Sequence, residues 1–166
     1  MRIPLKEDDI SDSIPPRIKI RGILETVMKE EEIVVHTDGG ARGNPGPSAC
    51  AFVAEINGKI IQQESSYLGT STNNYAEYQG VLLALKWLVK NFSTTTSTFY
   101  LDSELVVRQL NGIYKVKDKK LIELFDKIKD LSKSLNYAIT YKHIPRTQNK
   151  IADFLVNKEL DGNIKN

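Results

Sequence analysis

The chain of 166 residues has a single cysteine, Cys50, and no long uninterrupted run of apolar residues. One cysteine excludes an intrachain disulfide and a cysteine-rich zinc site, and it suits a reducing compartment. The longest apolar stretch, VLLALKWLV, is interrupted by Lys86 and is too short to cross a bilayer. Nothing resembles the apolar core of a secretory signal. We therefore expect a soluble cytoplasmic protein with no membrane association and no disulfide-linked partner.

A strong charge of one sign is also missing. The sequence has 23 Lys and Arg against 21 Asp and Glu, which gives a formal net charge of +2. This balance permits nucleic-acid binding without indicating it. With 40% hydrophobic and 27% charged residues, the chain has enough apolar material for one core but too little length for two full domains. We expect one compact domain and a monomer.

The sequence divides into three segments. Residues 1–31 contain Pro4, Pro15 and Pro16, an acidic cluster and one plausible short helix in IRGILETVMKEEE, so they are interpreted as an N-terminal extension of unknown role. Regular patterns begin at Glu32, and residues 32–160 are predicted to form the domain. Residues 161–166 are left as a C-terminal tail.

Residue patterns within the domain predict an α/β fold. Strand-like runs are IVVHT, SACAFVAEI and KIIQQESSYL, and Asn57-Gly58 between the last two favours a type I′ hairpin. The segment from Tyr75 to Asn91 is so apolar around its circumference that we predict a central buried helix. The remaining predicted elements are a strand in TSTFYL, a helix in SELVVRQLNG with Ser103 near its start and Gly112 as its stop, a helix over 119–134, a strand over 137–143 and a helix over 149–159. The order βββαβααβα predicts a mixed five-stranded sheet with helices on both faces.

Asp38 is predicted to follow the first strand and to precede GGARGNPGP, a segment rich in glycine and proline. Such a segment turns sharply and lets the backbone approach a ligand. It lacks the Gly-Lys-Ser/Thr ending of a phosphate-binding loop and leads into a strand, so that interpretation is weak. A simple hairpin turn explains the segment as well.

Three further carboxylates have ordinary structural explanations. Asn74-Tyr-Ala-Glu77 fits a helix capping box, Asp102 could cap the next helix, and Asp153 could occupy the exposed side of the last helix. Taken together they are harder to dismiss, because Asp38 and Asp102 are both predicted to end strands, where ligand sites are often assembled.

Four carboxylates brought together would repel one another unless cations neutralise them. Magnesium suits such a site because it prefers oxygen ligands and keeps exchangeable waters. Two ions about 4 Å apart could activate a water and stabilise a leaving 3′ oxygen. The four residues thus predict a magnesium site for phosphodiester hydrolysis.

Four segments carry a specific resemblance. TDGGARGNPGP, TNNYAEY, LDSELVVRQLNGIYKVK and HIPRTQNKIAD resemble, in this order, the motifs of the type 1 ribonuclease H family, and more closely its prokaryotic branch without the basic protrusion. The resemblance covers about residues 32–160. It implies a ribonuclease H fold and endonucleolytic cleavage of the RNA strand of RNA/DNA hybrids with Mg²⁺ or Mn²⁺.

The resemblance also implies roles for individual residues. Asp38, Glu77, Asp102 and Asp153 match the metal-binding carboxylates, and His143 matches a mobile histidine that assists proton transfer or product release; an ordinary exposed loop histidine is the alternative. Asn44, Asn73 and Asn74 match residues that hydrogen-bond the substrate, and an amide can serve a ribose 2′-OH as both donor and acceptor. Helix capping is the alternative for Asn73 and Asn74. Further expected substrate contacts are the backbone of Gly39, Gly40 and Arg42, and the side chain of Arg146.

The chain departs from its relatives at two places. Glu104 stands where many have Gln, which adds negative charge near the site. In place of the basic protrusion, GIYKVKDKK offers a cluster of lysines, of which Lys117 and Lys119 are the expected contacts to phosphates of the DNA strand; a solvated loop is the alternative. His36, in the first strand, is interpreted as structural.

Two other functions stay open at this point. One is a noncatalytic ribonuclease H-like module that binds nucleic acid or a protein, which the presence of all four carboxylates argues against. The other is a broader nuclease that also cuts double-stranded RNA, because shape and 2′-OH contacts would suffice for that substrate.

Overall fold

A computed structural model describes residues 31–93 and 96–164. The predicted N-terminal extension, with its short helix, lies outside the described residues apart from Glu31. The last two residues of the predicted C-terminal tail lie outside them as well.

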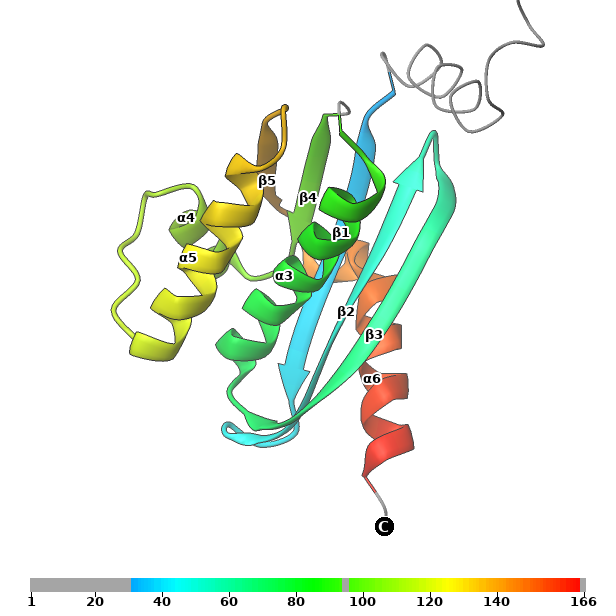
Figure 1. Ribbon diagram of the computed structural model, residues 1–166. Helices are drawn as coiled ribbons and strands as arrows, with labels where there is room; N and C mark the ends of the chain where they lie inside the picture. The colour runs from blue at the N-terminus through cyan, green and yellow to red at the C-terminus, as the bar shows by residue number, and fades with distance from the viewer. Residues whose placement is uncertain (1–30, 94–95, 165–166) are drawn as a thin grey trace, which may run out of the picture.

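The described residues form one five-stranded sheet in the order β3-β2-β1-β4-β5 (Figure 1). β1 pairs antiparallel with β2 and parallel with β4, β2 pairs antiparallel with β3, and β4 pairs parallel with β5. The predicted mixed sheet is therefore confirmed. The strands are β1 (Ile33–Ala41), β2 (Gly46–Ile56), β3 (Lys59–Ser71), β4 (Ser97–Leu101) and β5 (Ile139–His143).

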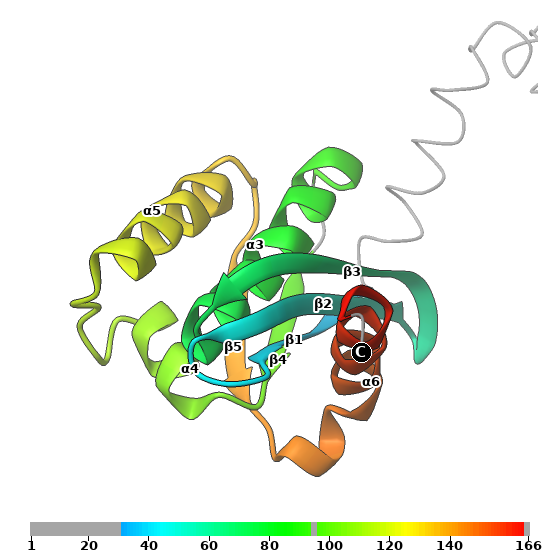
Figure 2. The same cartoon turned by 90° about the horizontal axis from the view of Figure 1, so that it is seen from below.

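The helices lie on both faces of the sheet (Figure 2). α3, α4 and α5 share the core on one face, and α6 lies on the other, against β1, β2 and β3. The order of strands and α-helices is the predicted one, with one short 3₁₀ segment, η1, added before the last helix. The helices are α3 (Asn73–Asn91), α4 (Glu104–Leu110), α5 (Lys119–Lys133), η1 (Arg146–Gln148) and α6 (Lys150–Asn163).

The main core lies between the sheet and α3. Val81, Leu85 and Leu88 of α3 are fully buried against strand residues that include Ile33 and Phe99. This confirms the prediction of a central buried helix. A smaller apolar cluster on the opposite face joins α6 to β2 and contains Ala49, Ala51, Val156 and Leu160.

Several predicted boundaries move. β1 continues to Ala41 because Gly39, Gly40 and Ala41 still pair with β2, so the prediction that Asp38 ends its strand is wrong. The connection to β2 is only Arg42–Pro45, which agrees with the hairpin alternative. The Asn57-Gly58 turn is confirmed, since both residues have positive φ. α6 runs four residues past its predicted end at Glu159.

No helix among the described residues is long and apolar enough to span a membrane.

Candidate metal site and substrate surface

Three of the four predicted carboxylates lie together. Asp38, Glu77 and Asp102 each offer an oxygen, and these oxygens lie within 4.8 Å of one another. Asp38 is 6% and Glu77 is 7% exposed, and Asp102 is half-buried. A group of three carboxylates, two of them buried, has the composition of a site for a hard divalent cation.

Strand register places Asp38 beside Asp102. His36 of β1 lies opposite Tyr100 of β4, and their rings stack with centroids 5.3 Å apart. Side chains alternate along a strand, so the residue two positions further on each strand lies on the same face. The β1–β4 pairing ends at this pair, so Asp38 and Asp102 lie where the two strands separate. His36 thus packs against β4, and its structural role stays a prediction.

Two glycines let Glu77 reach the same point from α3. A Cβ on Gly39 of β1 would lie 2.1 Å from the backbone carbonyl carbon of Ala76. A Cβ on Gly80 of α3 would lie 2.7 Å from the backbone carbonyl oxygen of Asp38. Strand and helix can approach this closely only without those side chains. The glycine after Asp38, which the sequence suggested was free to approach a ligand, therefore serves the contact that positions Glu77.

The structural alternatives for Glu77 and Asp102 are wrong. Thr72 is the N-cap of α3, and its hydroxyl accepts a hydrogen bond from the Tyr75 N–H at 3.2 Å, so no capping box involves Asn74 and Glu77. Ser103 caps α4, with its hydroxyl accepting from the Val106 N–H at 3.4 Å. Neither Glu77 nor Asp102 therefore caps a helix.

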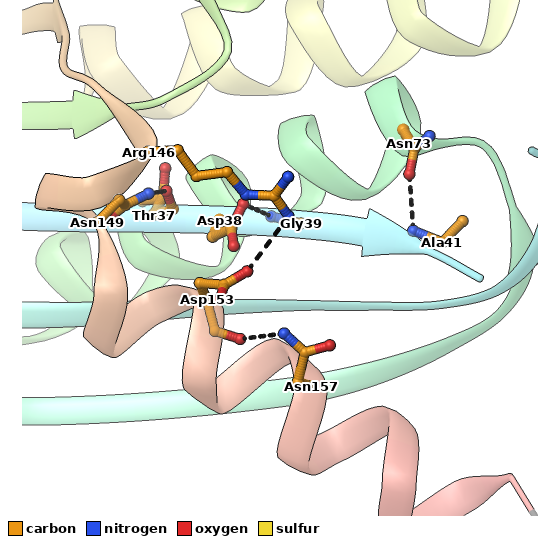
Figure 3. A network of polar contacts seen from close by, with 9 residues as sticks. All are labelled: Thr37, Asp38, Gly39, Ala41, Asn73, Arg146, Asn149, Asp153 and Asn157. Atoms are coloured by element: carbon orange, nitrogen blue, oxygen red, sulfur yellow. Dashed lines mark hydrogen bonds and ion pairs between the residues drawn. The ribbon is translucent and has the colours of Figure 1, made fainter. Parts of the chain in front are cut away.

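Asp153 lies in the first turn of α6 (Figure 3). It is not one of the three carboxylates whose oxygens lie within 4.8 Å of one another. Its side chain is 35% exposed and lies 3.6 Å from the guanidinium of Arg146, which reaches toward it from η1. Asp153 is nevertheless close enough for its charge to raise the pKa of Asp38. The fourth carboxylate therefore borders the site from the opposite face of the sheet.

The acidic group is electrostatically strained. Burial, and next the charge of Asp102, raises the pKa of Asp38 to about 7, although the Gly39 N–H donates to its Oδ1 at 2.9 Å. Burial and the charges of Asp38 and Asp102 raise the pKa of Glu77 well above its usual range. Cations would relieve this repulsion.

The donor set fits a metal on structural grounds. Glu77 Oε2 is buried and has no hydrogen-bond partner among the described residues. A buried carboxylate oxygen without a donor is costly unless a cation takes the donor's place. Three carboxylates and no nitrogen or sulfur ligand suit Mg²⁺ or Mn²⁺ better than zinc or copper.

His143 ends β5 and lies beside the site. Its Nε2 lies 3.2 Å from the carbonyl oxygen of Asp102, and the side chain is exposed. The structure thus brings His143 next to Asp102 of the candidate metal site, while its role stays a prediction.

The predicted substrate residues link the first hairpin to the start of α3. The Asn73 backbone N–H donates to Asn44 Oδ1 at 3.0 Å, and the Ala41 N–H donates to Asn73 Oδ1 at 2.8 Å. Asn73 and Asn44 are exposed, and Asn74 is half-buried. Because Thr72 caps the helix, neither Asn73 nor Asn74 has the N-cap position that was their alternative.

The other expected backbone contacts differ in exposure. Gly39 is buried against α3, and Gly40 is half-buried beside Val156 of α6. Arg42 is exposed, and its guanidinium pairs with Asp161 of α6 at 2.5 Å. Arg146 is 81% exposed. Their contacts with a substrate stay predictions.

The lysine cluster is exposed, and part of it shares a groove with the asparagines. Lys117 lies in the loop before α5, and Lys119 and Lys120 begin that helix. The groove runs between α3, the end of β3 and α5 and is lined by Asn44, Asn74, Lys86, Lys119, Lys120 and Lys127, among others. Glu104 does not line this groove, and its carboxylate pairs with the guanidinium of Arg108 at 2.8 Å, one turn along α4.

Asn149 lies near the site and was not among the sequence-predicted functional residues. It is 1% exposed, and its Nδ2 donates to the Thr37 carbonyl at 2.9 Å (Figure 3). The sequence offered only its place at the start of the last predicted helix as a signal.

Comparison with known proteins gives consistent matches. A family model described as "Reverse transcriptase-like" matches residues 36–159. Ribonuclease HI of Halobacterium salinarum is 35% identical over 126 residues, which cover 75% of this chain and 62% of that protein. The bifunctional protein Rv2228c of Mycobacterium tuberculosis is 35% identical over 133 residues, which cover 78% of this chain and 36% of that protein. The chain therefore spans only about a third of this longer relative.

A solved structure agrees with the sequence matches. LC11-RNase H1 in complex with an RNA/DNA hybrid is 40% identical to this chain, with a TM-score of 0.75. The match covers 78% of this chain and 97% of the other.

Proposed function

The chain belongs to the type 1 ribonuclease H family, and on this premise we propose that it is an endoribonuclease that hydrolyses the RNA strand of RNA/DNA hybrids with divalent metal ions. The observation that carries the proposal is the buried group of Asp38, Glu77 and Asp102, in which Glu77 Oε2 has no partner among the described residues. A noncatalytic module has no need to bear the cost of three carboxylates whose charges repel.

We assign the metal ligands to Asp38, Glu77 and Asp102, with Asp153 at the border of the site. Two Mg²⁺ ions, or Mn²⁺ in their place, would supply Lewis-acid stabilisation of the attacking and leaving oxygens. The protein contributes the anchoring of the ligands on β1, just after β4 and on α3, which limits the reorganisation needed during the reaction. Because the carboxylates repel one another, binding of cations also stabilises the folded site.

The expected products are 5′-phosphate and 3′-hydroxyl ends. Hydrolysis joins a water oxygen to phosphorus and breaks the bond from phosphorus to the 3′ oxygen, which must then gain a proton. His143 is exposed and adjacent to Asp102, so we assign it to proton transfer at the leaving 3′ oxygen.

Recognition of the RNA strand is assigned to the asparagines at the start of α3. Asn44, Asn73 and Asn74 present amides, which match a ribose 2′-OH in both its donor and its acceptor role. Asn73 is hydrogen-bonded both to Asn44 in the hairpin connection and to Ala41 of β1. Because Asp38 also lies on β1, these bonds fix the two asparagines relative to it. We assign the backbone of Arg42 and the side chain of Arg146, which is 81% exposed, to further contacts with the substrate. The complex of LC11-RNase H1 with a hybrid supports this substrate class.

The DNA strand is assigned to the groove lined by lysines. Lys119 lines the α5 side of this groove, and Lys117 lies two residues before Lys119 in the chain. Each lysine that neutralises a phosphate steepens the salt dependence of binding. Lys117→Ala and Lys119→Ala should therefore flatten the slope of log affinity against log salt, and an unchanged slope would remove the cluster from the surface.

We further propose that residues 32–160 form the catalytic unit, which agrees with the family match over 36–159, and that the protein acts as a cytoplasmic monomer. The only cysteine is buried, which supports the absence of a disulfide-linked partner.

Cleavage assays test the function directly. Wild type and Asp102→Asn are incubated with labelled RNA/DNA, RNA/RNA and DNA/DNA duplexes in Mg²⁺, Mn²⁺ or EDTA. We expect wild type alone to cut the RNA of the hybrid, only with metal. No metal-dependent cleavage by wild type would refute the proposal, and equal cutting of RNA/RNA would refute hybrid specificity.

A further inference from the structure

Asn149 occupies the point at which β1 loses a neighbouring strand. Pairing between β1 and β4 stops at His36 and Tyr100, whereas β1 continues beside β2 as far as Ala41. Backbone groups on the open side need other partners when they are buried. The Thr37 carbonyl finds one in Asn149 Nδ2 at 2.9 Å, and both residues are almost fully buried. The amide of Asn149 thus stands in for a strand N–H immediately before Asp38.

The backbone of Asn149 holds Asp153. The Asp153 N–H donates to the Asn149 carbonyl at 3.1 Å, and the Asn149 N–H donates to the Arg146 carbonyl at 3.0 Å. One residue therefore contacts the neighbour of Asp38 through its side chain and Asp153 through its main chain.

The side chain of Asn149 does not serve its own helix. Asn149 has the N-cap position of α6, yet its side chain makes no capping hydrogen bond. An N-cap asparagine normally stabilises its helix by accepting a hydrogen bond from the first turn. Here the side-chain amide donates a hydrogen bond to the Thr37 carbonyl of β1 and makes none to the first turn of α6.

Apolar packing gives the first turn of α6 little other support. The apolar cluster on this face involves Val156 and Leu160, one to two turns further along. Ile151 and Phe154, which flank Asp153, are 46% and 62% exposed. Of the first-turn residues only Ala152 is fully buried.

We propose that Asn149 is a positioning residue that fixes Asp153 relative to Asp38, Glu77 and Asp102, and so sets the metal affinity of the site. This rests on the proposed function insofar as the site binds metal. Partners that orient metal ligands typically change metal affinity by about 10- to 100-fold when removed.

The first test compares Asn149→Ala with Asn111→Ala. Asn111 Nδ2 donates to the Tyr141 carbonyl of β5 at 3.1 Å, so this control removes the same kind of bond away from the carboxylates. Mn²⁺ binding is measured by calorimetry on the full chain without nucleic acid. We expect about tenfold weaker Mn²⁺ binding for Asn149→Ala, and an unchanged affinity for Asn111→Ala. Equal affinities in wild type and Asn149→Ala would overturn the proposal.

Asn149→Ser separates positioning from folding. Serine is a good N-cap but is too short to bridge to Thr37, so it should recover thermal stability and keep the defect in Mn²⁺ binding. Recovery of both thermal stability and Mn²⁺ affinity would show a purely structural role and overturn the proposal. If Asn149→Ala does not fold, this variant carries the test.

Kinetics give an independent readout. The Mg²⁺ concentration for half-maximal cleavage should rise about tenfold in Asn149→Ser, while KM for the hybrid stays within about twofold. A raised KM with an unchanged metal requirement would contradict the proposal. If wild type cleaves nothing but its Mn²⁺ binding depends on Asn149, the proposed function fails and the positioning role stands.

Discussion

Glu77 and Asp153 approach the same site from opposite faces of the sheet, and they are held there by different means. Glu77 is 7% exposed and lies on the central helix α3, which touches β1 through two glycines. Asp153 is 35% exposed and lies on α6, whose first turn depends largely on hydrogen bonds through Asn149.

The difference separates a fixed part of the site from an adjustable part. Close backbone contact between Gly39 and α3 leaves Glu77 no room to move without disturbing the main core. A half-exposed first turn held by few polar contacts can shift at a lower cost. In the proposed metal site, Glu77 is therefore the fixed ligand beside Asp38 and Asp102, and Asp153 borders the group from a segment that also carries Arg146.

The largest expected effect is on catalysis and compares the two sides directly. Glu77→Gln should lower kcat on a hybrid by at least about a hundredfold, because it removes a ligand from the fixed group. Asp153→Asn should lower kcat by only about tenfold, since this residue borders the group. Single-turnover cleavage at saturating Mg²⁺ measures both, and equal losses would contradict the distinction.

The second prediction concerns the glycine contact under Glu77. Gly39→Ala places a Cβ 2.1 Å from the Ala76 backbone and should lower the free energy of unfolding by about 3 kcal/mol. Gly162→Ala is the control on α6, where a Cβ meets nothing within 4 Å, and it should raise that free energy by about 1 kcal/mol. Urea denaturation distinguishes them. A mild effect of Gly39→Ala would mean that the contact is less tight than described.

The third prediction follows from the raised pKa of Asp38. The folded protein binds more protons than the unfolded chain between pH 3.8 and about 7, so this contribution to stability is present at low pH and lost as pH rises through 7. The Asp38→Asn variant has no charge to bury at this position, so it should not lose stability as the pH rises. In EDTA at pH 8 its free energy of unfolding should exceed that of wild type by about 1 to 2 kcal/mol. Denaturation at pH 5 and pH 8 measures this difference. Parallel pH profiles for the two proteins would contradict the assigned repulsion.

The smallest expected effect tests the exposed side. Arg146→Ala removes a 3.6 Å ion pair at an 81% exposed residue, so the free energy of unfolding should change by less than about 0.5 kcal/mol. KM for the hybrid should rise about threefold at moderate salt if Arg146 contacts a phosphate. Arg108→Ala, which breaks the pair with Glu104, is the matched control and should leave KM unchanged. Equal KM values for both variants would remove Arg146 from the binding surface.

Much of the fold was predictable because the sequence patterns are local. The alternation of apolar residues in the strands, the apolar circumference of α3 and the Asn57-Gly58 turn predicted the element order correctly. Boundaries were less predictable, since Gly39 to Ala41 look like a loop by composition and become strand only by pairing with β2. The extension of α6 to Asn163 likewise lacked a sequence signal.

The candidate site was predictable as a set of residue types and less so as an arrangement. Asp38, Glu77 and Asp102 were chosen from their motifs, and the structure brings them together. The capping explanations for Glu77 and Asp102 could be dismissed only once Thr72 and Ser103 were seen to cap their helices. Asn149 gave no chemical signal, because its importance depends on a carbonyl 112 residues away.

The sequence by itself determined the class of chemistry: carboxylates in four ordered motifs, asparagines beside them, and a single cysteine that excludes an intrachain disulfide and a cysteine-rich zinc site. Only the tertiary structure decided that three carboxylates are fixed and one is adjustable. Local patterns specify elements, but the distances between carboxylates depend on where β4 ends, how closely α3 approaches Gly39 and which group satisfies the Thr37 carbonyl. These contacts join residues far apart in the chain. The free energy of each contact depends on burial, which arises only when several segments pack together.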